Sequence, residues 1–256
     1  MSYDDIATEY DAAFAWESDP DVILPVWRQL GSPSRVIEFA CGPARLLSTL
    51  VANGVFGIGV DISRPMLELA RVYLGATGGA FELHEARLED FEVNAPVGGA
   101  LCAAGSFGHL ATQDAAFAHL SRARDVLEES GRYGIQLSLK PVVRTEGTVP
   151  DASMGWEFEL EGETLRYIWY GTGIDPDAKQ EVQRSRIEWL TGPRRGEIAE
   201  NDHLMSIWDW ARWSDLIRAA GFEEVSALDA RHNFQVLQLG PDLHGYPQAW
   251  HVLAPA

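Results

Sequence analysis

The chain has 256 residues and a hydrophobic content of 46%, which fits one α/β domain with an elaboration or a domain with a small cap. Its formal net charge of −18 argues against a nucleic-acid partner, because neutralising phosphates requires clustered Lys and Arg. The two cysteines, Cys41 and Cys102, suit neither a disulfide framework nor a zinc site, so a reducing, cytoplasmic location is expected.

The first predicted elements are two N-terminal helices. Apolar side chains follow helical spacing through residues 3–16, and Asp19 followed by Pro20 predicts the start of a second helix that runs to Leu30. We assign residues 1–30 to an N-terminal helical lid, although the same pattern also fits helices packed on the edge of the domain.

Residues 35–61 have the order strand, tight turn, helix, strand and acid. The first strand, 35–39, contains Glu38 and precedes Gly42, and the second strand, 55–61, ends in Asp61. This order is typical of the opening βαβ unit of a nucleotide-binding fold, whose ligands lie beyond the carboxyl ends of the strands. An acid about 20 residues after the glycine turn is suited to ribose hydroxyls.

The residues of the turn in this unit distinguish between two classes of ligand. A dinucleotide site requires G-x-G-x-x-G, whereas here only Gly42 is glycine and Ala40 and Ala44 hold the flanking small positions. The Glu38 carboxylate would repel a phosphate and attract an amine. A ligand with a ribose, an amino-acid cation and no phosphate satisfies both observations, and S-adenosylmethionine is such a ligand.

At these residues the chain resembles the class I S-adenosylmethionine-dependent methyltransferases. Their first motif, an acid, any residue, a small residue, any residue and Gly, reads Glu38-Phe39-Ala40-Cys41-Gly42, and the resemblance extends over most of residues 35–140. It implies an α/β, Rossmann-like, doubly wound sheet of seven strands with the last strand antiparallel and helices on both faces. The implied cofactor is S-adenosylmethionine, with S-adenosylhomocysteine as the product.

The resemblance also implies which residues contact the cofactor. The run from Asp61 to Leu67 is similar to the second motif of the family, which places Asp61 on the ribose hydroxyls and makes Ile62 and Met66 walls of the adenine slot. The full implied set is Tyr10, Glu38, Ala40, Cys41, Gly42, Asp61, Ile62, Met66, Glu85, Ala86, Arg87, Ala103 and Phe107.

The predicted strand 100–104 leads into a loop with candidate catalytic chemistry. The loop contains Ser106, Phe107 and His109, and Thr112 is the expected N-cap of a helix over about 114–128. Similar Ser-Phe-x-His-Leu runs occur in small-molecule methyltransferases, which implies that Ser106 binds substrate. His109 is the candidate general base, because an imidazole has a suitable pKa, but it could equally order the loop or cap the helix.

The remainder of the chain is predicted to be a β-rich insert followed by the end of the core. Residues 141–208 form hairpins that cap the substrate, and residues 31–140 with 209–256 form the cofactor-binding core. Tyr3, Trp156, Tyr167 and Trp169 are the predicted substrate-binding aromatics of the lid and cap. Their alternation with polar residues also fits burial, and no feature of the sequence selects one of the nearby Arg166, Arg184 and Arg186 as a substrate ligand.

Three functions remain open at this stage. The first is a methyltransferase acting on an N or O atom of a small molecule, the second acts on a carbon atom, and the third is a non-catalytic module that binds the cofactor. The sequence holds no membrane-spanning apolar run and no metal-ligand spacing, so neither a membrane partner nor a metal is expected. A homodimer is one option for the oligomeric state.

Overall fold

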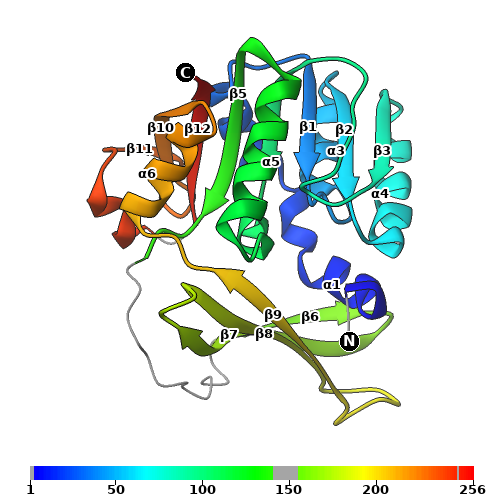
Figure 1. Cartoon of the computed structure of the whole chain (residues 1–256). Coiled ribbons are helices and arrows are strands. Elements are labelled where there is room, and N and C mark those ends of the chain that lie inside the picture. The colour runs from blue at the N-terminus through cyan, green and yellow to red at the C-terminus, as the bar shows by residue number, and fades with distance from the viewer. Residues whose placement is uncertain (1–2, 141–154, 247) are drawn as a thin grey trace. The chain divides into compact units, whose positions relative to one another are not determined.

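The computed structural model describes residues 3–140, 155–246 and 248–256, which form two compact units (Figure 1). The larger unit holds the described residues 17–140 and 208–256, and the smaller unit holds 3–16 and 155–207. The segment 1–30, predicted as one lid, therefore contributes its described residues to both units. The predicted insert residues 141–154 lie outside the described residues.

The larger unit is built on an eight-stranded sheet with the strand order β11-β10-β12-β5-β4-β1-β2-β3. Its strands from β1 to β5 are parallel, and β12 runs antiparallel to both β5 and β10. The strands are β1 (Arg35–Phe39), β2 (Phe56–Asp61), β3 (Phe81–Glu85), β4 (Val97–Cys102), β5 (Leu127–Leu137), β10 (Phe222–Asp229), β11 (Gln235–Leu237) and β12 (Ala249–Pro255). The predicted doubly wound sheet is confirmed, and the short β11, antiparallel to β10, is an eighth strand beyond the seven predicted.

Helices cover both faces of this sheet (Figure 1). One face packs against α2 (Pro20–Gln29), α3 (Arg45–Ala52) and α4 (Arg64–Thr77), and the other packs against α5 (Gln113–Val126) and α6 (Trp210–Ala219). Each face has its own buried apolar core, because strands covered on both sides bury both sets of alternating side chains. No helix among the described residues is long and apolar enough to span a membrane.

Side-chain caps fix where four of these helices begin. Asp19, Ser63, Thr112 and Asp209 each accept a hydrogen bond from a backbone N–H two or three residues further along. These bonds satisfy N–H groups that have no partner within the helix. The helix starts predicted at Asp19 and Thr112 are thereby confirmed.

In its described residues the smaller unit consists of a four-stranded antiparallel sheet and the helix α1 (Ala7–Ala13). The single-turn segments η1 (Tyr3–Asp5) and η2 (Ala15–Ser18) flank this helix, and the last two residues of η2 belong to the larger unit. The strands of the smaller unit are β6 (Trp156–Leu160), β7 (Glu163–Asp175), β8 (Gln180–Trp189) and β9 (Ile198–Ser206). On one face, Leu165, Tyr167, Ile187 and Trp189 form a buried apolar cluster with Ile6 and Ala13 beside α1. The predicted β-hairpins are present in the described part of the insert, and β9 ends it at Ser206.

Replacing a glycine by alanine should have opposite effects on the free energy of unfolding at two positions of the larger unit. A Cβ added at Gly59 in β2 would lie 2.7 Å from Leu83 Cδ2 and 2.9 Å from Cys41 Sγ, whereas a Cβ at Gly75 in α4 would meet no atom within 4 Å. Gly59→Ala should lower the free energy of unfolding by about 1–3 kcal/mol through overpacking. Gly75→Ala should raise it by up to about 1 kcal/mol through helix propensity. Urea denaturation measures both, and equal effects of the two substitutions would contradict this packing.

Candidate functional site

The turn that follows β1 has an unusual backbone. Ala40, Gly42 and Ala44 adopt φ angles of 50°, 51° and 57°, and the Cys41 N–H donates to the Val60 carbonyl at 3.1 Å. Left-handed alanines cost about 1–2 kcal/mol each, so this turn stores strain of the kind found at functional sites. An added Cβ at Gly42 would meet nothing within 4 Å, which leaves space for a ligand to approach the backbone.

The Asp61 carboxylate connects this turn to the end of β2. Its Oδ2 accepts a hydrogen bond from the Gly42 N–H at 2.8 Å, and its Oδ1 accepts one from the Ser63 N–H at 2.8 Å. Next to it, Ile62 is 64% exposed, although it is a large apolar residue. A carboxylate that is held in place beside an exposed apolar side chain fits the hydroxyls of a ribose and the face of a base.

Glu38 is buried on β1, and its Oε2 accepts a hydrogen bond from the Leu47 N–H at 3.2 Å. Leu47 lies in the first turn of α3, so this carboxylate caps a helix whose own N-cap residue, Ala44, has no side chain that could do so. Burial raises the pKa of Glu38 well above its ordinary value, and the nearby Glu17 carboxylate raises it further. The site therefore favours a cationic ligand, which would offset the cost of ionising Glu38.

Arg45, the first residue of α3, is a buried cation that the sequence analysis missed. Its Nη1 donates to Ser18 Oγ at 2.8 Å, its Nη2 donates to the Tyr73 hydroxyl at 2.8 Å, and its guanidinium lies 4.6 Å from the centroid of the Tyr73 ring. It thereby connects η2, α3 and α4. The position of Arg45 at a helix start beside the glycine turn is the one feature of the sequence that could have indicated a role in the site. An Arg at such a position is usually exposed, so its burial was not predicted.

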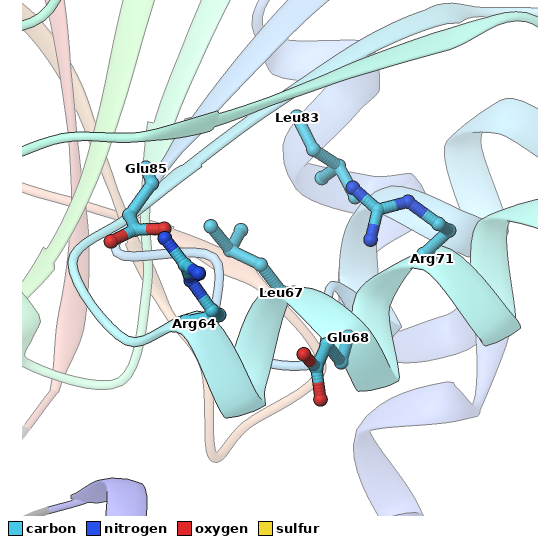
Figure 2. A pocket seen from close by; sticks show the side chains of 6 residues that line it. All are labelled: Arg64, Leu67, Glu68, Arg71, Leu83 and Glu85. Carbon is cyan, nitrogen blue, oxygen red and sulfur yellow. The ribbon is translucent and has the colours of Figure 1, made fainter.

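The groups predicted at the end of β3 all have partners within the protein. The Glu85 carboxylate pairs with Arg64 at 3.0 Å, the Ala86 N–H donates to the Asp61 carbonyl at 3.0 Å, and Arg87 pairs with Glu89 at 3.0 Å. Glu85 and Arg64 lie in a surface groove of about 340 Å³ between α4 and β3, which Leu67, Glu68, Arg71 and Leu83 complete (Figure 2). Only Glu85 of this groove belongs to the predicted cofactor set.

The loop after β4 brings Ser106, Phe107 and His109 into one turn, η3 (Ser106–His109). The Ala104 N–H before it donates to Gln136 Oε1 of β5 at 2.7 Å, and Gln136 was not predicted. Ser106 and His109 are half-buried, and burial lowers the pKa of His109 from its ordinary value of 6.5. The imidazole is therefore neutral at neutral pH and able to accept a proton.

Like Glu38 and Cys41, the predicted cofactor residues Phe107, Met66 and Ala103 have little or no exposed surface. Phe107 packs against Trp208, Trp213 and His119, with ring centroids 5.9, 5.6 and 5.8 Å away. These contacts explain the burial of the Phe107 side chain without any contact to a ligand. Met66 is buried within α4, and Ala103 is buried at the end of β4. A ligand would reach these positions through the backbone or not at all.

The smaller unit holds the predicted residues Tyr10, Trp156, Tyr167 and Trp169. Tyr10 and Tyr167 lie 6.3 Å apart, Tyr167 and Trp156 lie 4.9 Å apart, and Trp156 Nε1 donates to the Ala13 carbonyl at 2.8 Å. Trp169 instead stacks on His203 at 4.7 Å. For Tyr3 only the backbone, in η1, is described.

Three arginines of the smaller unit pair with carboxylates of the same sheet. Arg166 pairs with Glu157 at 2.7 Å, Arg186 pairs with Glu188 at 2.7 Å, and Arg184 donates from Nη2 to Asp202 at 2.8 Å. These pairs form a ladder across one face of the sheet. The idea that one of these arginines binds a substrate anion has no support from this geometry.

Comparison with known proteins identifies the larger unit. Residues 36–131, which include the turn, Glu38 and Asp61, match the model of the methyltransferase domain family. The matched residues form a methyltransferase domain, and the chain is similar to the class I S-adenosylmethionine-dependent methyltransferases. It is an enzyme of the methyltransferase class, and its cofactor is S-adenosylmethionine. No curated protein matches the chain in sequence.

Solved structures with the same fold support this assignment at the level of architecture. A S-adenosylmethionine-dependent methyltransferase from Clostridium acetobutylicum aligns over 99% of both chains with a TM-score of 0.74 and 13% identity. CalS10, an amino pentose methyltransferase from Micromonospora echinaspora, aligns over 97% of both with a TM-score of 0.72 and 17% identity. KedS8, a sugar N-methyltransferase from Streptoalloteichus, aligns over 95% of this chain and 87% of its own with a TM-score of 0.66 and 17% identity. At these identities the likeness concerns the fold.

The residues present fit this cofactor. In this fit Asp61 would hold the ribose hydroxyls, Glu38 would pair with the ammonium group once ionised, and the space beside Gly42 would admit the ligand. Among the described residues, no group of three His, Cys, Asp or Glu is arranged to hold a metal ion.

The substitution Glu38→Gln tests the stability cost of ionising the buried Glu38 carboxylate and the contribution of its charge to cofactor binding. The amide can still accept from the Leu47 N–H, but it cannot ionise. Because burial raises the pKa of Glu38 in the folded state, ionisation costs stability as the pH rises above the ordinary value of 4.5. We expect Glu38→Gln to be more stable than the wild type at neutral pH, with a difference that vanishes near pH 4.

The same substitution should weaken binding of S-adenosylmethionine at neutral pH by about 10- to 100-fold, the range for a lost charged hydrogen bond. Urea denaturation across a pH series and calorimetric titration measure the two effects. A variant that is less stable at every pH, with unchanged affinity, would show that Glu38 is only a helix cap.

Proposed function

We propose that the chain transfers the methyl group of S-adenosylmethionine to a nitrogen or oxygen atom of a small molecule, with an amine as the favoured acceptor. The observation that carries the proposal is the Asp61 carboxylate, which accepts from the N–H groups of both Gly42 and Ser63 at the carboxyl end of β2. This arrangement supports a ribose site at the edge of the sheet where ligands of such folds bind.

We assign separate roles to three residues of the larger unit. Asp61 binds the two ribose hydroxyls, Glu38 attracts the ammonium group of the amino-acid part, and His109 accepts the proton that the acceptor loses. When bound, S-adenosylmethionine supplies a methyl group that is already activated as a sulfonium substituent. The protein therefore has to align the acceptor and exclude water, and an amine acceptor needs only to arrive unprotonated.

The choice of acceptor rests on two observations. CalS10 and KedS8, whose fold this chain shares, are named as an amino pentose methyltransferase and a sugar N-methyltransferase. Burial keeps His109 neutral at neutral pH, so it can take a proton from an ammonium product or from a hydroxyl. We infer a small acceptor that carries an amine.

Asp61→Ala tests the cofactor site. The wild type should be stabilised by S-adenosylmethionine and S-adenosylhomocysteine, by about 2.7 kcal/mol at a concentration of 100 Kd, and Asp61→Ala should lose this response. Asp229→Ala is a matched control, because Asp229 also ends a strand and accepts a turn N–H, from Arg231 at 2.9 Å. Thermal unfolding measures the shift. A wild type that responds to neither ligand would remove the proposed function.

His109→Ala tests the proton acceptor. We expect the affinity for S-adenosylmethionine to stay within a few-fold and kcat to fall by about 10²- to 10⁴-fold, the usual contribution of a general base. Because burial lowers the pKa of His109, the acid limb of kcat/KM should lie below pH 6.5 in the wild type and be absent from the variant. Lost cofactor binding with unchanged turnover would assign His109 to the cofactor site instead.

A further inference from the structure

The residues that follow β3 form a short loop, 86–91, which we refer to as the β3 loop. At its start, the Ala86 N–H donates to the Asp61 carbonyl at 3.0 Å. Further along, the Asp90 N–H donates to the Arg87 carbonyl at 3.2 Å and closes a tight turn. The β3 loop therefore begins directly beside Asp61, the residue to which we assign the ribose.

Helix α5 holds the β3 loop by two of its backbone carbonyls. The His119 Nδ1–H donates to the Leu88 carbonyl at 2.7 Å, and Arg122 Nε donates to the Phe91 carbonyl at 2.9 Å. His119 and Arg122 are three residues apart on α5, so they project from the same side of the helix. The Arg122 guanidinium also lies 6.0 Å from the centroid of the Phe91 ring. One side of α5 thus fixes two points of the β3 loop.

The partners of His119 determine where its proton lies. A carbonyl can only accept, so Nδ1 carries the hydrogen that meets Leu88. Burial lowers the pKa of His119 to about 4, so at neutral pH Nε2 is unprotonated and accepts from the Tyr133 hydroxyl at 2.7 Å. The Tyr133 hydroxyl is hydrogen-bonded in turn to Cys102. Both nitrogens of this fully buried imidazole therefore have a partner, and one of the partners lies in the β3 loop.

The His119 ring also contacts the loop that carries His109. Its centroid lies 5.8 Å from that of Phe107, which belongs to η3, and 4.8 Å from that of Phe39 at the end of β1. A leucine could fill most of this apolar space, but it could not donate to Leu88. The hydrogen bond to the β3 loop, rather than the packing, is therefore what a histidine adds at this position.

The order of the strands places the base of the cofactor beside the β3 loop. Strand β2 lies between β1 and β3, and Asp61 is its last residue. We assign the ammonium group to Glu38 of β1 and the ribose to Asp61. The base is attached to the ribose on the side away from the amino-acid part, so it extends from Asp61 toward β3. The surfaces there are the exposed Ile62 and the start of the β3 loop.

We propose that His119 is a positioning residue for the cofactor: through the Leu88 carbonyl it holds the β3 loop in the place where that loop forms a wall of the base site. Arg122 supports it at the Phe91 carbonyl. Neither side chain touches the cofactor, and both act through the backbone of the β3 loop. This inference rests on the proposed function.

The test uses calorimetric titration of the full chain with S-adenosylhomocysteine and with 5′-methylthioadenosine, which keeps the adenosine part but has no ammonium group. His119→Leu cannot donate to Leu88, so it should weaken the binding of both ligands by about tenfold or more. In His119→Asn the amide nitrogen takes the position of Nδ1 and can still donate to Leu88. Its affinities should stay within about threefold of those of the wild type.

Two further variants separate a positioning role from a structural one. Tyr133→Phe removes the other hydrogen bond of the same imidazole and keeps the bond to Leu88. It should lower the midpoint of urea unfolding about as much as His119→Leu does, yet leave both affinities within about threefold. Glu38→Gln should show the converse selectivity, because it should weaken S-adenosylhomocysteine and leave 5′-methylthioadenosine within about threefold.

Arg122→Met keeps the inference testable if His119→Leu fails to fold, because the Arg122 side chain is 40% exposed. It removes the bond to Phe91 and should weaken both ligands by about threefold or more.

Three results would overturn the inference. The first is a folded His119→Leu that binds 5′-methylthioadenosine as tightly as the wild type, or, where it does not fold, an Arg122→Met that does so. The second is a Tyr133→Phe that loses as much affinity as His119→Leu. The third is a His119→Asn that binds as weakly as His119→Leu. Failure of the wild type to bind S-adenosylhomocysteine would instead reject the proposed function.

Discussion

The two hydrogen bonds that Asp61 accepts are the interaction on which the cofactor site depends. One comes from the Gly42 N–H in the turn after β1, and the other from the Ser63 N–H at the start of α4, each at 2.8 Å. Hydrogen bonds to a charged group contribute about 1.5–3 kcal/mol each, enough to hold both turns in one geometry before any ligand arrives. In the proposed function the same carboxylate also binds the ribose hydroxyls, so one side chain would both build the site and bind in it.

Other features of this site cost stability. Ala40 and Ala44 are left-handed, and Glu38 is buried where burial itself raises its pKa. A glycine at either alanine and an amide at Glu38 would lower these costs without changing the fold. Their presence is understandable if the turn must hold a fixed shape and a buried acid must be in place to ionise beside an incoming cation, since a preorganised site carries such costs before it binds.

Rules that relate residues close in sequence predicted many features of this chain. They could not predict contacts between residues that are far apart in sequence. The N-caps Ser63 and Thr112 were predictable because a cap is a relation between residues two or three positions apart. The burial of Arg45 was not, because its partners Ser18 and Tyr73 lie 27 and 28 residues away in sequence. Strand β11 was missed because three residues after a turn carry no period that could reveal a strand.

The smaller sheet shows the same limit at the level of single side chains. Arg184 and Gln183 are neighbours in sequence, yet alternation sends them to opposite faces and into different chemistry. Arg184 meets Asp202 across the strand pair, so the protein itself neutralises its charge. Gln183 instead accepts from the Trp169 indole and donates to the Glu181 carboxylate. The strand register, which composition and spacing do not reveal, thus decides which side chains pair with one another on each face of the sheet.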